Sequence, residues 1–319
     1  MINKDFSIVF MGTPQFAVTI LDKIISEGYN VKAVVTATDK PAGRGRKIQE
    51  SEVKQYAKSN QLRLMQPENL KDDSFIDELK KLKADLFVVV AFRMLPKVVW
   101  EIPEFGTINL HGSLLPQYRG AAPINWAVIH GEKKTGVTTF FINDQIDTGD
   151  ILLQAELCIE ENETAGDIHD KMMHLGAETV VRTIQRIREN KADAIPQPLT
   201  GEDLRPAPKI FREDCRIDLR KDVDSIHNFI RGLSPYPASW IRLRKKDSDK
   251  EYIFKVFEAR KMNSEEHTEL RLAKIDDKLV LHVFKGTLEL QIVQLEGKKR
   301  MDSKQFLTGF DPEHWELVS

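Results

Sequence analysis

The chain has 319 residues, of which 41% are hydrophobic and 30% are charged, and its formal net charge is −2. This composition excludes a wholly disordered chain, and the balanced charge means that a nucleic-acid partner has to be bound by a local basic patch. The two cysteines, Cys158 and Cys215, give neither a disulfide framework nor metal-ligand spacing. The sequence lacks an apolar run of the ~18 residues that a membrane span needs, and its polar first residues do not look like a signal peptide. We therefore expect a cytoplasmic protein with two domains, since a domain usually holds ~100–200 residues.

Strand and helix patterns alternate through the first half of the chain. A buried strand is expected at residues 6–11, and Thr13 and Pro14 then offer a helix N-cap and a first helical residue. Further strands are expected at 31–36, 62–65, 86–90, 107–110, 136–142 and 151–159. Helices are expected at 52–59 and 75–82 and, as a long amphipathic helix, around 168–187, whereas 39–47 is expected to be a glycine-rich basic loop. This alternation predicts an α/β fold with a doubly wound, mainly parallel sheet, which binds ligands beyond the carboxyl ends of its strands.

A domain boundary is expected where prolines crowd a stretch with few apolar residues. Pro196, Pro198, Pro206 and Pro208 lie there. We assign residues 1–190 to a catalytic domain, 191–208 to a linker and 209–319 to a second domain. The second domain has one helix pattern and then strand patterns at 239–243, 252–257, 279–284 and 288–295, which predict a mostly β barrel or sandwich.

The segment with the strongest chemical signal follows the strand at 107–110. Asn109 and His111 are two residues apart, so both side chains lie on the same face, near the edge of the sheet where active sites form. The segment Ile146–Asp150 places one or two carboxylates, those of Asp147 and Asp150, in a polar loop between two later strands. A carboxylate beside a histidine favours the charged imidazole and fixes its orientation. Each of these signals alone is more often a structural turn.

The order of several segments makes the chain resemble the methionyl-tRNA formyltransferase family. The matching segments are Phe10–Ala17, Lys40–Lys47, Asn109–Gly120, Asp147–Asp150, Ile230–Pro237 and Gly297–Met301. The resemblance implies a Rossmann-like formyltransferase fold followed by an OB-like β barrel. The Asn-x-His…Asp set is shared with the wider superfamily that uses 10-formyltetrahydrofolate, whereas the other segments narrow the acceptor to initiator methionyl-tRNA.

The family's reaction is transfer of a formyl group to the α-amine of methionine on the tRNA. The resemblance makes Asn109, His111 and Asp147 the catalytic residues, with no metal required. It also implies folate binding by six residues: Ser113, Leu114, Leu115, Pro116, Phe92 and Met94. The last two lie where the family often has Ala-Tyr-Gly-x-Ile and this chain has Ala91-Phe-Arg-Met-Leu95.

Contacts with tRNA are expected from two basic segments. They comprise Lys40, Arg44, Arg46 and Lys47 in the basic loop, and Lys298, Lys299 and Arg300 in the second domain. Such clusters neutralise phosphates, although each could also be an ordinary solvated surface. We expect a monomer that binds tRNA and folate and does not bind a membrane.

Three other functions fit parts of the sequence. The same chemistry could act on an amino-sugar nucleotide or another small amine, and the basic loop argues against that acceptor. A non-catalytic RNA-binding protein would not need Asn109, His111 and Asp147 to converge. Hydrolytic release of formate would use the same three residues, without the C-terminal barrel.

Overall fold

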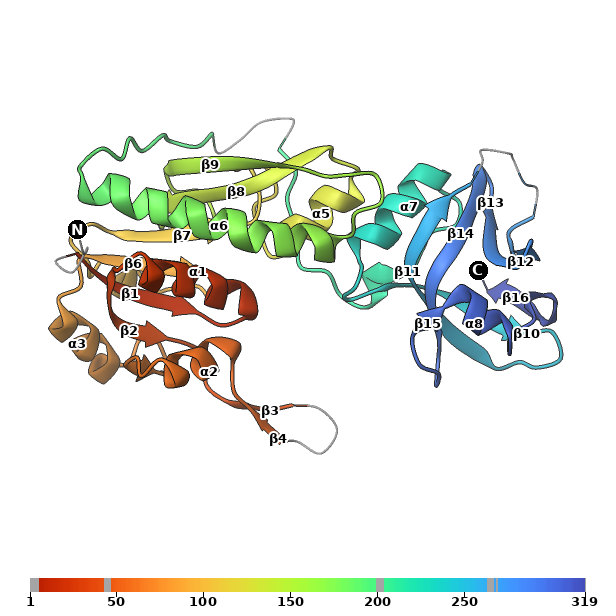
Figure 1. Cartoon of the computed structure of the whole chain (residues 1–319), viewed down its shortest axis with the longest axis horizontal. Coiled ribbons are helices and arrows are strands. Elements are labelled where there is room, and N and C mark those ends of the chain that lie inside the picture. Colours follow the sequence, from red (N-terminus) through yellow and green to blue (C-terminus); the bar gives the residue numbers. More distant parts are fainter. Residues whose placement is uncertain (1–5, 43–46, 199–203, 263–266, 268, 319) are drawn as a thin grey trace. The chain divides into compact units, whose positions relative to one another are not determined.

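The computed structural model describes residues 6–42, 47–198, 204–262, 267 and 269–318 (Figure 1). Contacts divide the chain into two compact units. The first unit consists of residues 1–120, 136–157 and 170–206, and the second consists of 121–135, 158–169 and 207–319. The sequence domains 1–190, 191–208 and 209–319 stay a prediction.

The first unit is built on a seven-stranded sheet with the order β5-β2-β1-β6-β7-β8-β9. Its strands are β1 (Ser7–Gly12), β2 (Asn30–Val35), β5 (Leu64–Met65), β6 (Leu86–Val90), β7 (Thr107–His111), β8 (Lys134–Phe141) and β9 (Ile151–Cys158). The first five strands in this order are parallel, and β8 pairs antiparallel with β7. The predicted α/β fold with a mainly parallel sheet is confirmed.

The helices of this part alternate with the strands. They are α1 (Gln15–Ser26), α2 (Glu52–Ser59), α3 (Asp73–Leu82), α4 (Lys97–Trp100) and the long α6 (Ala165–Arg188). Ser51 and Asp72 cap α2 and α3 with side-chain oxygens, as helix-start signals predict. The expectation for α1 was wrong by one residue, because Pro14 occupies the N-cap in place of Thr13. Within the described residues, no helix is long and apolar enough to cross a bilayer.

The expected loop at residues 39–47 is a hairpin in part. Residues Lys40–Ala42 form β3 and pair antiparallel with β4 (Lys47–Gln49). The residues between the two strands lie outside the described part of the chain. The sequence pattern does not predict these strands, since each has only three residues and the segment is rich in glycine.

The core of the sheet explains why these strands form. Every residue of β1 and β6 is buried, which is the pattern of parallel strands that are covered on both faces. Val9, Met11, Phe87 and Val89 pack on one face against the apolar stripe of α3. This packing fixes the central strands, and with them the edge of the sheet at which β7 ends.

The second unit contains a nearly closed antiparallel barrel, with the strand order β12-β13-β14-β11-β10-β16 and β15 paired to β14. Its strands are β10 (Ser239–Lys245), β11 (Glu251–Lys261), β12 (Arg271–Ile275), β13 (Lys278–Val283), β14 (Gly286–Leu295), β15 (Met301–Asp302) and β16 (Trp315–Val318). The end strands β12 and β16 contact each other, which confirms the predicted β barrel. Its helices are α5 (Pro123–Ile129), α7 (Val223–Gly232), α8 (Ser303–Leu307) and two 3-10 turns, Glu213–Cys215 and Pro312–His314.

Aromatic residues pack together in the core of the second unit. Phe254 is fully buried, and its ring lies 5.5 Å from that of Phe306 and 6.2 Å from that of Phe310.

Cys158 is exposed and Cys215 is buried, and both are free thiols.

Helix α7 packs against β11 and buries a histidine there. His227 is 2% exposed, and its Nε2 has no hydrogen-bond partner among the described residues. Burial lowers the pKa of His227 to about 4, and the nearby charges of Arg231 and Lys261 act in the same direction. The folded protein therefore holds this ring neutral at pH 7.

This histidine makes stability depend on pH. Because the pKa of His227 is about 4 in the folded protein and 6.5 as its ordinary value, the unfolded chain gains a proton first as the pH falls. The free energy of unfolding should fall from about pH 6.5 down to pH 4, by roughly 2 kcal/mol between pH 7 and pH 5. Urea unfolding of wild type and His227→Leu at both pH values measures this. An equal loss in the variant would assign the effect to other groups.

Candidate active site

Strand β7 carries two of the expected catalytic residues to the edge of the sheet. Asn109 is half-buried, between Val89 of β6 and Phe140 of β8, and His111 is 6% exposed at the end of the strand. Alternation along the strand puts both side chains on one face. Among the described residues, none forms a hydrogen bond with the side-chain amide of Asn109. That amide can therefore donate to a ligand without breaking a contact.

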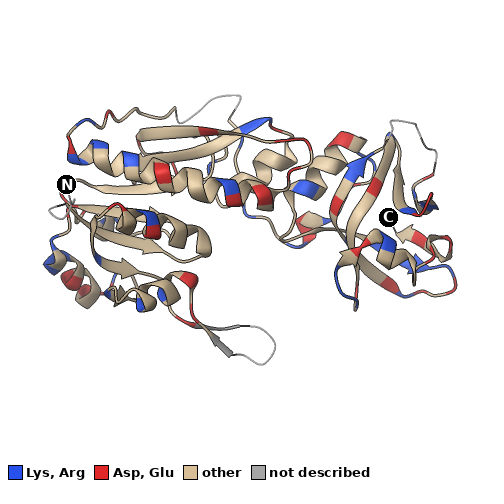
Figure 2. Cartoon of the chain, viewed as in Figure 1, with Lys and Arg blue, Asp and Glu red and all other residues tan. Residues whose placement is uncertain are grey.

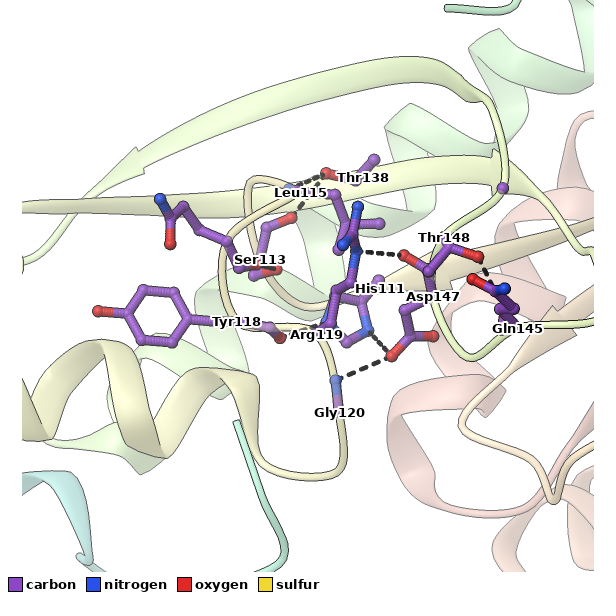
Figure 3. Close-up of polar contacts among 12 residues, drawn as sticks. His111, Ser113, Leu115, Tyr118, Arg119, Gly120, Thr138, Gln145, Asp147 and Thr148 are labelled. Atoms are coloured by element: carbon purple, nitrogen blue, oxygen red, sulfur yellow. Dashed lines mark hydrogen bonds and ion pairs between the residues drawn. The ribbon is translucent and has the colours of Figure 1, made fainter. Parts of the chain in front are cut away.

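Both ring nitrogens of His111 face oxygen atoms (Figure 3). Its Nε2 lies 2.8 Å from the carbonyl oxygen of Tyr118, and its Nδ1 lies 3.6 Å from Oδ2 of Asp147. A carbonyl oxygen can only accept, so Nε2 carries a hydrogen. An imidazolium, with a hydrogen on each nitrogen, would satisfy both contacts.

Asp147 lies in the loop between β8 and β9. Its side chain is 13% exposed, and its Oδ2 accepts a hydrogen bond of 2.9 Å from the backbone N–H of Gly120. The backbone at Asp147 is left-handed, with φ 55°. The loop then passes so close to β8 that a Cβ on Gly149 would lie 1.6 Å from the carbonyl oxygen of Phe141, so only glycine fits there. The structure thus brings His111 and Asp147 together.

The segment Tyr118–Gly120 contributes three contacts that sequence reasoning missed. Tyr118 accepts from His111, Arg119 Nε donates to the carbonyl oxygen of Asp147 at 3.0 Å, and Gly120 donates to the Asp147 carboxylate. Tyr118 and Gly120 have positive φ values, 60° and 125°. One feature of the sequence pointed to these residues: Tyr118–Gly120 is the end of the segment Asn109–Gly120, which resembles the formyltransferases.

A buried threonine holds the turn after His111. The hydroxyl of Thr138 donates to the carbonyl oxygen of Ser113 at 2.7 Å and accepts from the backbone N–H of Leu115 at 3.1 Å. Gln154 donates to the same hydroxyl at 3.0 Å and to the carbonyl oxygen of Leu115 at 2.8 Å. The side chains of Ser113 and Leu115 are buried in the protein, whereas Leu114 and Pro116 are half-buried.

Comparison with known proteins identifies the family. The family described as "Formyl transferase" matches residues 6–184, and "Formyl transferase, C-terminal domain" matches residues 209–311. The chain belongs to the formyltransferase family. It is 52% identical over 303 residues to a methionyl-tRNA formyltransferase of Flavobacterium johnsoniae, covering 95% of each chain. It is 50% identical over 315 residues to the methionyl-tRNA formyltransferase of Bacteroides fragilis, covering 97% of each.

Solved structures of more distant proteins share the fold. An N-formyltransferase of Helicobacter canadensis, in complex with folinic acid and dTDP-3-aminofucose, matches with a TM-score of 0.65 at 22% identity, over 91% of this chain and 99% of that one. HypX of Aquifex aeolicus in complex with tetrahydrofolic acid matches with a TM-score of 0.64 at 17% identity, over 98% of this chain and 50% of that one. At these identities the likeness establishes the formyltransferase fold alone.

The two expected folate residues after β6 differ in exposure. Phe92 packs against the core cluster under the sheet, and Arg93 lies over its ring at 5.7 Å. Met94 is 74% exposed and lines a surface cavity of about 730 Å³ together with Arg93 and Lys97. Their role in folate binding stays a prediction.

The expected tRNA residues are only partly described. Arg44 and Arg46 lie outside the described residues, as do the side chains of Lys40 and Lys47 in β3 and β4. In the second unit, Lys298 and Lys299 are exposed and form no ion pair with any described residue.

Arg300 is engaged within the second unit. Its guanidinium lies 4.2 Å from the ring centre of Phe257 and 3.4 Å from a carboxylate oxygen of Glu258. Within the described part of the chain, no group of three or more His, Cys, Asp or Glu side chains could hold a metal ion.

The hydroxyl of Thr138 can be tested directly. Thr138→Val keeps the shape of the side chain but leaves Ser113 O and Leu115 N without this partner, and each such buried group costs roughly 1–3 kcal/mol. We expect a lower free energy of unfolding in urea for Thr138→Val, and a value close to wild type for Thr138→Ser. Equal stability of the valine variant and wild type would show that the hydroxyl does not hold the turn.

Proposed function

We propose that this formyltransferase moves the formyl group of 10-formyltetrahydrofolate to the α-amine of methionine on initiator methionyl-tRNA. The observation that carries the proposal is identity of about half the residues with methionyl-tRNA formyltransferases over both units. The geometry of β7 supports it, because Asn109 lies two residues before His111 on the strand, and His111 faces the carboxylate of Asp147.

The reaction needs one bond formed, one broken and one proton moved. The neutral amine attacks the formyl carbon, and negative charge develops on the formyl oxygen. The bond from that carbon to the folate nitrogen then breaks, the amine loses a proton and the folate nitrogen gains one. A site for this chemistry therefore needs a donor at the oxygen and a group that carries a proton between the two nitrogens.

Asn109 is the donor that is ready for the formyl oxygen. Its amide lies half-buried at the sheet and has no hydrogen bond to a described residue, so it gives up no protein contact when it binds the developing charge. Removal of one such donor usually lowers turnover by ~10²–10³.

His111 and Asp147 are suited to move the proton. The carboxylate of Asp147 faces Nδ1 of the ring and is held by Gly120, so the pair can accept a proton from the amine and pass it to the leaving nitrogen. The ring stays in place because Tyr118 O binds Nε2 on its other side.

The folate pterin ring needs apolar walls near these groups. Leu114 and Pro116 are half-buried just after His111, and Ser113 and Leu115 are buried, so we assign the first two to side-chain contacts and the last two to shaping the turn. Phe92 supplies a further apolar surface at the end of β6.

The tRNA needs basic groups that are free to meet phosphates. Acidic and basic residues are interspersed over both units (Figure 2). The protein therefore has no uniformly positive surface that would attract the RNA as a whole, among the residues that the figure colours. Exposed Lys298 and Lys299 and the basic residues 40–47 supply local positive charge. The ion pair with Glu258 makes Arg300 a weaker candidate than these lysines.

An amino-sugar nucleotide is the alternative acceptor. Likeness of fold to proteins such as the N-formyltransferase from Helicobacter canadensis, at 22% identity, favours this acceptor. Parallel assays with labelled formylfolate and three acceptors separate the two: charged initiator tRNA, charged elongator tRNA and a dTDP-amino sugar. We expect label on the initiator tRNA. Transfer to the sugar in preference to the tRNA would overturn the proposal.

The role of Asn109 predicts a large loss of turnover on truncation. Asn109→Ala should lower kcat by ~10²–10³, because the formyl oxygen loses its donor, while the fold stays intact. Initial rates at saturating substrates measure kcat, and circular dichroism checks the fold. Turnover within a few-fold of wild type would remove Asn109 from the mechanism.

The basic loop predicts a defect confined to tRNA. Arg44 lies between Gly43 and Gly45, and its planar guanidinium can grip phosphate or a base edge with two hydrogen bonds. Arg44→Ala should therefore slow formylation of tRNA without changing folate affinity, and Arg44→Lys should recover part of the rate. If neither substitution changes the rate of tRNA formylation, the loop does not contact tRNA. If folate affinity falls as much as the rate, the loop belongs to the folate site.

A further inference from the structure

A buried glutamine from segment 191–208 reaches the loop that carries Asp147. Ile195 and Ile151 exchange two backbone hydrogen bonds of 2.8 Å, which joins this segment to the start of β9. Two residues later Gln197 is 7% exposed, although the sequence around it has the composition of a linker. A buried polar side chain in such a segment calls for partners.

The side-chain amide of Gln197 has all of its hydrogen-bonding positions filled. Its Nε2 donates to the carbonyl oxygens of Gly149 at 2.6 Å and of Asp147 at 3.2 Å. Its Oε1 accepts from Arg119, from Nη2 at 2.8 Å and from Nε at 3.3 Å. A glutamine amide has two donor hydrogens and two acceptor lone pairs, so this site uses the whole group.

These contacts connect the two segments that hold the His111–Asp147 pair. Arg119 belongs to Tyr118–Gly120, whose backbone binds both His111 and the Asp147 carboxylate. Arg119 also donates to the Asp147 carbonyl and to that of Pro198. Burial lowers the pKa of Arg119, while the carboxylate of Asp147 opposes this effect.

We infer that Gln197 is a positioning residue, which sets the Asp147 carboxylate against His111 by fixing the backbone of the Asp147 turn. The kinetic test of this inference rests on the proposed function, because it measures formylation of tRNA. The turn needs such support because Asp147 has a left-handed backbone, with φ 55°. With the amide removed, the carbonyl oxygen of Gly149 loses the Gln197 donor and that of Asp147 is left with Arg119, so the carboxylate can move away from Nδ1 of the ring.

Two variants separate the donor half of the amide from its acceptor half. Gln197→Met keeps the length of the side chain and removes both halves. Gln197→Glu keeps an acceptor for Arg119 but sets an oxygen against the carbonyls of Asp147 and Gly149. If the donor half positions Asp147, both variants should lose about 10–100-fold in kcat, with KM for folate and tRNA within about twofold. Gln185→Met is the matched control, because Gln185 is exposed on α6 and its side chain bonds, among the residues that the structure describes, only to Glu189.

A double-mutant cycle asks whether Gln197 acts through Asp147. In an Asp147→Asn background, measured by single turnover at high enzyme concentration, Gln197→Met should cost less than about threefold, because the charge it positions is already gone. A full, additive loss in that background would overturn the inference, as would full activity of Gln197→Glu, which would assign the role to the Arg119 contact alone.

A spectroscopic readout keeps the inference separate from the proposed function. In ¹⁵N-histidine-labelled protein, the ring resonances of His111 should shift in Gln197→Met and stay in place in Gln185→Met. Unchanged resonances in both variants would overturn the inference, whatever acceptor the wild-type enzyme uses. Absence of tRNA formylation by wild type, with the shift present, would overturn the proposed function and leave the positioning role intact.

Discussion

The candidate active site depends on one carboxylate oxygen, Oδ2 of Asp147, which accepts a hydrogen bond from the backbone N–H of Gly120 and faces the ring of His111. A charged acceptor that is largely withdrawn from water makes strong hydrogen bonds, and it is costly to leave unpaired. The same oxygen therefore joins two loops, one after β7 and one between β8 and β9. Once these loops are joined, the histidine has one orientation.

The sheet and the loops contribute different parts of the candidate site. The buried parallel strands fix where β7 ends, and Asn109 and His111 take their places from that strand alone. The loops supply an oxygen atom that faces each ring nitrogen of His111 and half-buried apolar residues beside the ring. A formyltransferase site needs both, because the donor for the formyl oxygen has to be rigid while two substrates enter from solvent.

Sequence reasoning reached the elements with strong periodicity and the side chains with obvious chemistry. The continuous apolar run Leu86–Val90 predicted a buried strand, and the spacing of Asn109 and His111 predicted a shared face. The sequence analysis missed β12 and β16, which have only five and four residues. It also missed the N-cap at Pro14, because backbone geometry and not residue type decided the helix start.

The sequence also does not predict the contacts between distant segments, because these contacts depend on backbone geometry. Tyr118 acts through a carbonyl group that every residue has, and Gln197 acts from a segment with linker composition. Neither contact leaves a periodic signal, since each depends on how separate segments meet in space. The resemblance to the family marked Tyr118–Gly120 as part of a matching segment, but only the structure assigns these residues contacts.

The ring of His111 is held between Tyr118 O and Asp147, with a hydrogen on Nε2. Nitrogen NMR of the ¹⁵N-histidine-labelled enzyme measures this most directly, with His111 assigned by comparison with His111→Asn. We expect a protonated Nε2 for His111, with a one-bond coupling between nitrogen and hydrogen, and a change at Nδ1 in Asp147→Asn. A hydrogen on Nδ1 alone, or a ring unaffected by Asp147→Asn, would contradict it.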